Sequence, residues 1–176
     1  MRTLLAAAAV CLALSTPAAA QTQTPPPPPA CESAAHRALD FWIGEWDAHR
    51  ADTNQLVGRS SIRSEDAGCV ITEHWVSVNA PYSGHSLNIL NRESGQWEQF
   101  WVDSTGNRTH FIGGPVDNGM QITTAAPVPV PGNPPQYMRV TLTRGEDGTV
   151  IQRGQSSPDA TTWTTQYLFI YRPRPE

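Results

Sequence analysis

The chain has 176 residues, of which 12 are Arg or Lys and 16 are Asp or Glu, so its formal net charge is −4. This composition argues against nucleic acid as a partner, because no cluster of positive charge is present to displace counterions from phosphates. All 12 of these basic residues are arginines. The absence of lysine also excludes lysine chemistry such as Schiff-base formation.

Residues 1–20 have the pattern of a secretory signal peptide. One arginine precedes an eleven-residue apolar run from Leu4 to Leu14, and small residues end the segment at Ala20. The run is too short to span a membrane as a helix, which takes about 20 apolar residues. We therefore expect cleavage after Ala20, no membrane span, and a mature protein that is periplasmic or secreted.

Residues 21–30, "QTQTPPPPPA", predict a disordered, proline-rich spacer, because they offer no large apolar side chain to bury. Residues 31–176 are numerous enough for one domain with a hydrophobic core. No second change of composition and no repeat divides them, so we expect a single folded domain there.

Two cysteines, Cys31 and Cys69, lie in this domain, and an exported protein enters a compartment that permits disulfides. A bond between them stabilises the fold by about 4 kcal/mol in the chain-entropy account. A redox or metal site would need companion residues that the sequence lacks. We therefore predict a structural disulfide between Cys31 and Cys69.

Turn signals recur every 11 to 16 residues along the domain, and the stretch "PVPVPGNPP" is one of them. The segments between them are rich in Val, Ile, Thr and aromatic residues and alternate as strands do. Short connections force consecutive strands to pair antiparallel, and closing about ten of them into an up-and-down barrel removes the exposed edges. The fold prediction is therefore all-β, with "SAAHRALDFW", N-capped by Ser33, as a short N-terminal helix or 3₁₀ segment over one mouth.

The stretch "LDFWIGEWD" resembles the start of the calycin superfamily, whose members are lipocalin-like barrels. In that superfamily a 3₁₀ segment leads into a G-x-W on the first strand, which Gly44 and Trp46 match here. The resemblance implies that Trp46 closes one end of the barrel beneath Arg172 of the last strand, with Arg174 as the second candidate. Together with "EHW" and "WEQFWVD", the stretch is also similar to a group of exported bacterial proteins with such barrels.

Three predicted strands, at 70–78, 84–91 and 96–103, have one face that mixes tryptophan with polar residues and one that is mostly aliphatic. Neither is charged and polar throughout, as the solvent face of an antiparallel sheet should be. A ten-stranded barrel has room for a small ligand, and aromatic walls with a few polar groups are typical of such pockets. We therefore assign the mixed face to the lumen as a ligand-binding set, namely Glu73, Trp75, Ser86, Asn88, Trp97, Gln99, Trp101 and Asp103.

The aliphatic face would then point outward and need cover. The N-terminal segment, the stretch "PVPVPGNPP" or a second subunit could supply it, so a homodimer is a candidate assembly. In the alternative, the aliphatic face is the core and the tryptophans form an exterior patch, which also needs a partner.

The sequence predicts no metal site, because spacings such as H-x-x-x-H and C-x-x-C are absent. His74, His85 and His110 lie on three different predicted strands, with His74 and His85 on the aliphatic face. Haem is the alternative, through a likeness to the nitrobindin-like proteins. The haem ligand of that group is a late His, however, and no His follows His110 here. We therefore expect no cofactor.

These features predict a barrel that binds a small, mostly apolar or amphipathic molecule in its lumen without catalysis, since motifs such as G-x-S-x-G are absent. One alternative is a barrel enzyme, a cyclase, isomerase or hydrolase, that uses Glu73 or Asp103 as acid or base. Another is a cell-envelope interaction protein whose strands bind a partner.

Overall fold

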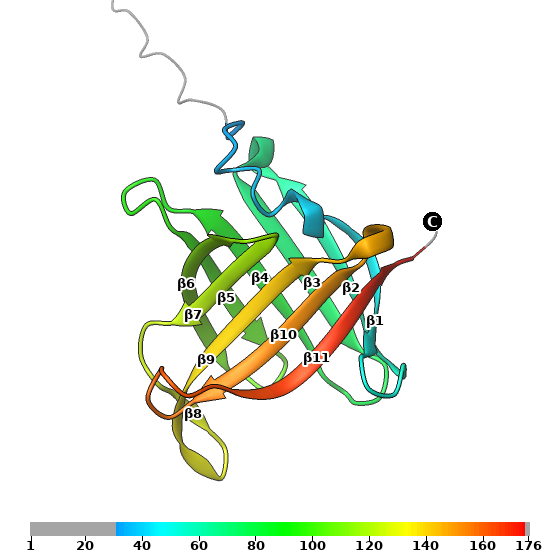
Figure 1. The fold of residues 1–176 in the computed structure, drawn as a ribbon, viewed down its shortest axis with the longest axis vertical. Helices are drawn as coiled ribbons and strands as arrows, with labels where there is room; N and C mark the ends of the chain where they lie inside the picture. The colour runs from blue at the N-terminus through cyan, green and yellow to red at the C-terminus, as the bar shows by residue number, and fades with distance from the viewer. Residues whose placement is uncertain (1–30, 175–176) are drawn as a thin grey trace, which may run out of the picture.

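The computed structural model describes residues 31–174, so the predicted signal peptide at 1–20 and the spacer at 21–30 lie outside the described residues. Eleven antiparallel strands form one sheet in this part of the chain (Figure 1). They are β1 (Gly44–Arg50), β2 (Leu56–Glu65), β3 (Val70–Ser77), β4 (Ser83–Leu90), β5 (Trp97–Asp103), β6 (Arg108–Val116), β7 (Gly119–Thr124), β8 (Val128–Val130), β9 (Asn133–Arg144), β10 (Val150–Ser157) and β11 (Thr164–Pro173).

Ten of these strands close into a barrel, as the sequence predicted. Neighbours in the chain pair in order from β1 to β7, β7 pairs with β9, and β9, β10 and β11 lead back to β1. The closing register places Asp47 of β1 opposite Arg172 of β11. The predicted turns form the hairpins, for example at Asn118, whose φ of 56° is a left-handed conformation that Asn tolerates.

The stretch "PVPVPGNPP" differs from the prediction, which treated it as a turn or as cover for the outer wall. Its first part forms β8, which pairs with the start of β9. This hairpin lies at the barrel end away from the N-terminal segment (Figure 1). Prolines can occupy it because β8 is an edge strand, where a missing N–H costs no ladder bond.

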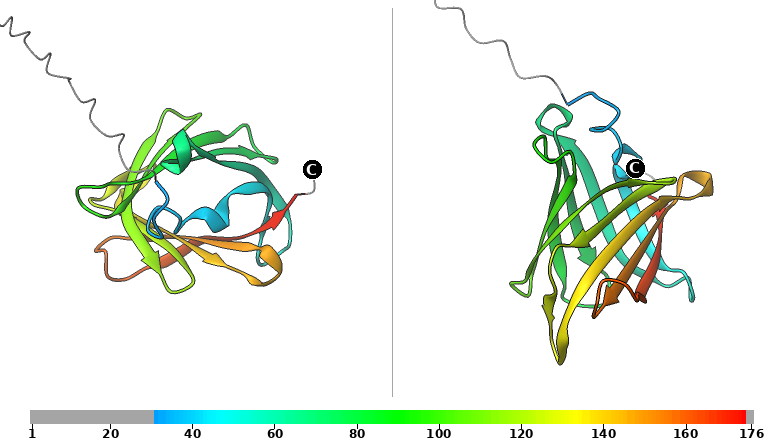
Figure 2. Two further views of the ribbon diagram at one scale, coloured as in Figure 1. Left: turned by 90° about the horizontal axis from the view of Figure 1, so that it is seen from above. Right: turned by 60° about the vertical axis from the view of Figure 1, so that its left-hand side comes forward.

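The N-terminal segment covers the other end of the barrel, as predicted, and its regular part is the 3₁₀ helix η1 (Asp40–Trp42). Seen along the barrel, it lies across the opening (Figure 2). Leu39 and Trp42 are almost fully buried in the core, and Trp97 donates its indole N–H to the carbonyl of Ala35 at 3.1 Å. We call residues 33–42 the plug.

The predicted disulfide between Cys31 and Cys69 is present, with 5.0 Å between the two Cα atoms. Cys69 follows the 3₁₀ helix η2 (Asp66–Gly68) and directly precedes β3. The bond therefore fixes the chain just before the plug to the barrel wall.

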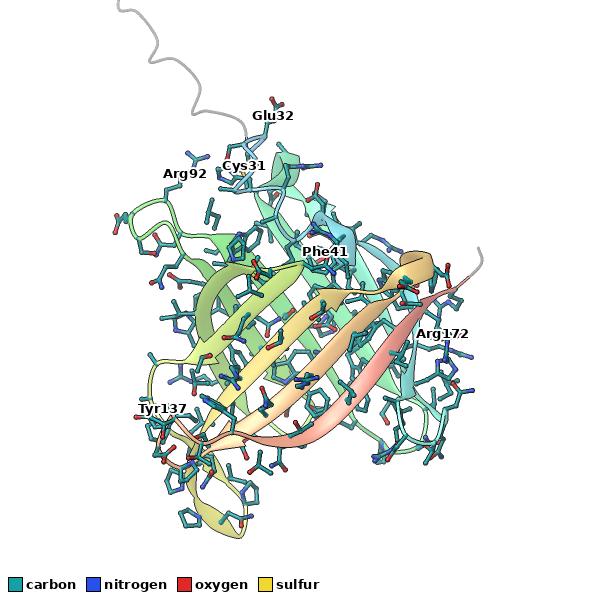
Figure 3. All side chains as sticks on the ribbon, in the orientation of Figure 1. Cys31, Glu32, Phe41, Arg92, Tyr137 and Arg172 are labelled. Carbon is teal, nitrogen blue, oxygen red and sulfur yellow. A yellow bond between two sulfur atoms is a disulfide. The ribbon has the colours of Figure 1, made fainter. Side chains whose placement is uncertain are left out.

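The predicted stacking of Arg172 on Trp46 needs correction. Side chains alternate along β11, and Tyr171 takes the inward position, so Arg172 lies on the outside of the wall (Figure 3). Trp46 is buried and contacts Tyr171 and Trp42 instead of Arg172. Its indole packs edge-on against Tyr171, with 6.3 Å between ring centroids, and donates to the carbonyl of Trp42 at 2.9 Å.

Arg174, the second candidate, forms an ion pair with Glu45. First and last strands are thus joined by backbone pairing, by this ion pair and by the Trp46–Tyr171 contact. Gly44 keeps its structural role, because its φ of 149° suits glycine as the chain leaves the 3₁₀ helix.

No helix among residues 31–174 is long and apolar enough to cross a membrane.

Candidate ligand-binding cavity

The mixed face of β3, β4 and β5 lies inside the barrel. Five of its eight predicted residues line a cavity of about 1050 Å³, namely Glu73, Trp75, Gln99, Trp101 and Asp103. Ser86 and Asn88 are buried on the same inner face, where they hydrogen-bond to residues that line the cavity. Trp97 lies at the plugged end, against Ala35. Ligand binding by this set stays a prediction.

The cavity lies toward the barrel end that the plug leaves open. Its lining includes the exposed turn at Gly106 and Asn107 and the segment 124–131 that contains β8. The plug and the core tryptophans beside it, Trp42, Trp46 and Trp97, are not part of the lining. A ligand would therefore enter past the β8 hairpin.

One wall of the cavity is aromatic and consists of Trp75 with Tyr167, Phe169 and Tyr171 of β11. Trp75 stacks on Phe169 with 6.0 Å between centroids and 5° between planes, and Tyr167 stacks on Phe169 at 4.7 Å. The three β11 residues were not among the lumen residues predicted from the sequence. The signal was present in "QYLFIYR", where aromatic rings recur at every second position.

Three glycines in neighbouring strands allow cavity aromatics to lie flat against the wall. A Cβ added to Gly58 would approach Trp75 Cζ2 to 2.1 Å, and one added to Gly84 would approach Trp101 Cζ2 to 2.2 Å. Gly154 provides the same space for Tyr167. These glycines were also missed, although an isolated glycine within a strand often marks the close approach of another group.

Glu73 is 4% exposed and lies on the inner wall without an ion-pair partner among residues 31–174. Ser60 donates its hydroxyl to Oε1 at 2.8 Å, and Ser86 donates to Oε2 at 3.2 Å. Burial disfavours the charged form and raises the pKa of Glu73 to about 7, although the two hydroxyls lower it in part. The carboxyl can therefore exchange a proton near neutral pH.

A chain of hydrogen bonds links Glu73 to Gln99. Asn88 Nδ2 donates to the backbone carbonyl of Ile71 at 2.9 Å and to the hydroxyl of Ser86 at 3.0 Å. Because a carbonyl can only accept, this end of Asn88 must be its amide nitrogen, and its Oδ1 faces Gln99. Gln99 Nε2 donates to that oxygen at 2.9 Å.

Asp103 lies at the end of β5, near the open mouth. It accepts hydrogen bonds from the backbone N–H of Thr105 at 2.9 Å and from the hydroxyl of Tyr82 at 3.3 Å. Burial raises the pKa of Asp103, but hydrogen bonds from Thr105, from the backbone of Asn107 and from Trp101 outweigh it and hold the pKa below its ordinary value. Asp103 is therefore ionised at neutral pH.

The histidines do not gather around the cavity. His74 and His85 are exposed on the outer wall, where their rings stack with centroids 4.2 Å apart. His110 of β6 lies near the mouth, but its ring stacks on Phe100 of the outer wall at 4.4 Å and bonds to Glu98 at 2.9 Å. Within residues 31–174, no group of three or more His, Cys, Asp or Glu side chains could share a metal ion.

The outer wall of β3, β4 and β5 carries the aliphatic face. Val76, Leu87, Phe100 and Val102 are 41–52% exposed, and we call these four residues the outer patch. Of the three covers proposed from the sequence, the plug and β8 leave these residues exposed, and a second subunit stays a prediction.

The sequence matches no protein-family model and no curated protein.

Proposed function

We propose that this protein is exported and binds a small, mostly apolar molecule in the cavity of its barrel, without catalysis. The observation that carries the proposal is the cavity of about 1050 Å³ with an aromatic wall on one side and a few polar groups on the other. Ligand pockets of proteins commonly measure roughly 300–1,000 Å³ and combine apolar walls with a small number of directed polar groups. The Cys31–Cys69 disulfide supports export, because such bonds persist in oxidising compartments.

A calycin relationship is part of this proposal. It is supported by the closed ten-stranded barrel, by η1 directly before Gly44, and by the buried position of Trp46. The expectation of no cofactor stays part of the proposal too, with haem as the alternative to be checked by absorbance of the purified protein.

Tryptophan fluorescence tests the proposed binding, because Trp75 and Trp101 line the cavity while Trp163 lies outside it, beneath Arg139. A panel of lipids, isoprenoids and aromatic compounds should contain a ligand that quenches fluorescence and raises the melting temperature. Trp163→Phe should keep this response, whereas Trp75→Phe and Trp101→Phe should each weaken it. The proposal fails if no compound changes either signal, or if all three variants respond as the wild type does.

A barrel enzyme is the second candidate, because two carboxyls line one cavity and their pKa values are shifted in opposite directions. The pKa of Glu73 is raised to about 7 by burial, while hydrogen bonds hold that of Asp103 low despite burial. Such a pair can serve as acid and base. Turnover of a bound cavity ligand, abolished in both Glu73→Gln and Asp103→Asn, would favour the enzyme, and release of every ligand unchanged would eliminate it.

A cell-envelope interaction protein is the third candidate, favoured by the outer patch. A partner or a second subunit would bury these four side chains. Sedimentation of the mature protein tests the homodimer, which Leu87→Arg should dissociate. A strict monomer at all concentrations would count against it.

A further inference from the structure

Building on the proposed function, we propose that the ligand of this cavity carries an organic cation, a protonated amine or a quaternary ammonium group. The cation would lie on the face of Trp101, between the carboxylates of Glu73 and Asp103. Its apolar part would contact the aromatic wall.

The strand register places Trp101 between the two carboxyls. Trp101 lies opposite Ser86 on β4, and Ser86 lies opposite Glu73 on β3. Asp103 follows Trp101 by two residues on β5 and therefore points to the same inner face. Among protein rings, the indole attracts cations most strongly, and two nearby negative charges add to the attraction.

Within residues 31–174, no basic side chain neutralises these carboxyls, and no ion pair involves Glu73 or Asp103. The basic residues of the lining are Arg108 and His110 of β6. They pair with Val102 and Phe100 of the outer patch, so their side chains lie on the outer face of the wall. An anionic ligand would therefore meet like charge inside, whereas a cation would supply the missing partner.

Gln99 gives an independent indication that the ligand donates hydrogen bonds. It is 7% exposed and lines the cavity. Its Nε2 donates to Asn88 Oδ1. The orientation of the Asn88 amide is fixed by the backbone carbonyl of Ile71, which accepts a hydrogen bond from Asn88 Nδ2. Gln99 Oε1 accepts no hydrogen bond within residues 31–174 and is accessible from the cavity, where it can accept one from a ligand. An ammonium group supplies N–H donors, and a quaternary ammonium supplies polarised C–H groups.

The tyrosines around the cavity experience the same negative field. Burial raises the pKa of Tyr82, and the charges of Asp103 and Glu73 raise it further. Burial also raises the pKa of Tyr167 and Tyr171, with Glu73 as the next cause in both. All three are therefore neutral near pH 7, and the net charge of the inner wall comes from Glu73 and Asp103.

The test compares benzyltrimethylammonium with neopentylbenzene, an uncharged molecule of the same shape, on the mature protein. We expect the cation to bind at least about tenfold more tightly. Asp103→Asn should bring the ratio of the two affinities close to one, whereas the control Glu93→Gln, on an exposed turn outside the cavity, should keep the wild-type ratio.

The pH dependence adds a second readout, because the charge of benzyltrimethylammonium does not titrate. Its affinity should rise as the pH is raised through about 7, where Glu73 ionises. Glu73→Gln should remove this rise. A rise that persists in this variant would contradict a contact between the cation and the Glu73 carboxyl.

The possible outcomes distinguish failure of the cation proposal from failure of the proposed function. Equal affinity for the two compounds, or binding of neopentylbenzene alone, would overturn the cation proposal. The proposed binding of a ligand in the barrel would still stand. If neither compound binds but the wider panel yields an uncharged ligand, the cation is again wrong. If no compound binds at all, both proposals fail.

Discussion

The hydroxyl of Ser60 donates to Oε1 of Glu73 at 2.8 Å, across neighbouring strands and inside a buried wall. The carboxyl is held in place by this bond and by Ser86, yet no ion-pair partner contacts it in the described residues 31–174. Its protonation should therefore be visible in the stability of the whole barrel.

Glu73→Gln should change how stability depends on pH. A carboxyl whose pKa is higher in the folded than in the unfolded state loses stability as the pH rises between the two values, here 4.5 and about 7. The loss is on the order of 3 kcal/mol, so Glu73→Gln should be more stable than the wild type at about pH 8 and similar at about pH 4. Urea unfolding at both pH values measures this. Glu93→Gln, on an exposed turn, is the control and should keep the wild-type slope.

Gly84→Ala should destabilise the barrel and weaken ligand binding. The new Cβ would come within 2.2 Å of the Trp101 ring, which must tilt off the wall and into the cavity. Overpacking of this kind costs about 1–3 kcal/mol. Gly114→Ala is the matched control, because an added Cβ there meets nothing within 4 Å. Equal melting temperatures for the two variants would show that Trp101 does not depend on this glycine.

Trp46→Phe should cost more stability than Trp42→Phe, although both indoles are buried in the core. Trp46 loses a hydrogen bond to the carbonyl of Trp42, and that carbonyl loses its donor. The Trp42 indole N–H has no hydrogen-bond partner within the described chain, so phenylalanine removes an unsatisfied donor there. The difference should be about 1 kcal/mol in denaturant unfolding. The reverse order would contradict this assignment.

Replacing Cys31 and Cys69 together by serine should lower stability by about 2–5 kcal/mol. The plug would keep its packing through Leu39 and Trp42 but lose its covalent anchor at the start of β3. Thermal unfolding with and without a reducing agent checks this result. The wild type should respond to reduction and the double variant should not, whereas a wild type insensitive to complete reduction would refute the role of the bond.

The barrel could be predicted from the sequence because alternation and turns are local signals. In β3, for example, Ile71, Glu73 and Trp75 face inward and Thr72, His74 and Val76 outward, and their order in the chain already separates the two faces. The plug and the disulfide followed from equally local features. Five of the eight proposed lumen residues line the cavity for the same reason.

The rest of the site depends on the pairing and register of strands that are distant in the chain. Local sequence patterns do not predict this register. Whether Arg172 or Tyr171 faces Trp46 depends on the pleat of the closing strand, where a shift by one residue exchanges the two. The space that Gly58 and Gly84 leave for Trp75 and Trp101 depends on the register between strands. β8 was missed because its prolines read as a turn.

Within residues 31–174, the plug and its disulfide cover one end of the barrel, and the cavity lies toward the other end. If the proposed ligand binds there, it would enter and leave past the β8 hairpin and the turn at Gly106. Two different ligands would then compete for one site without any change in the shape of the barrel. A protein that received the ligand would have to approach the β8 end.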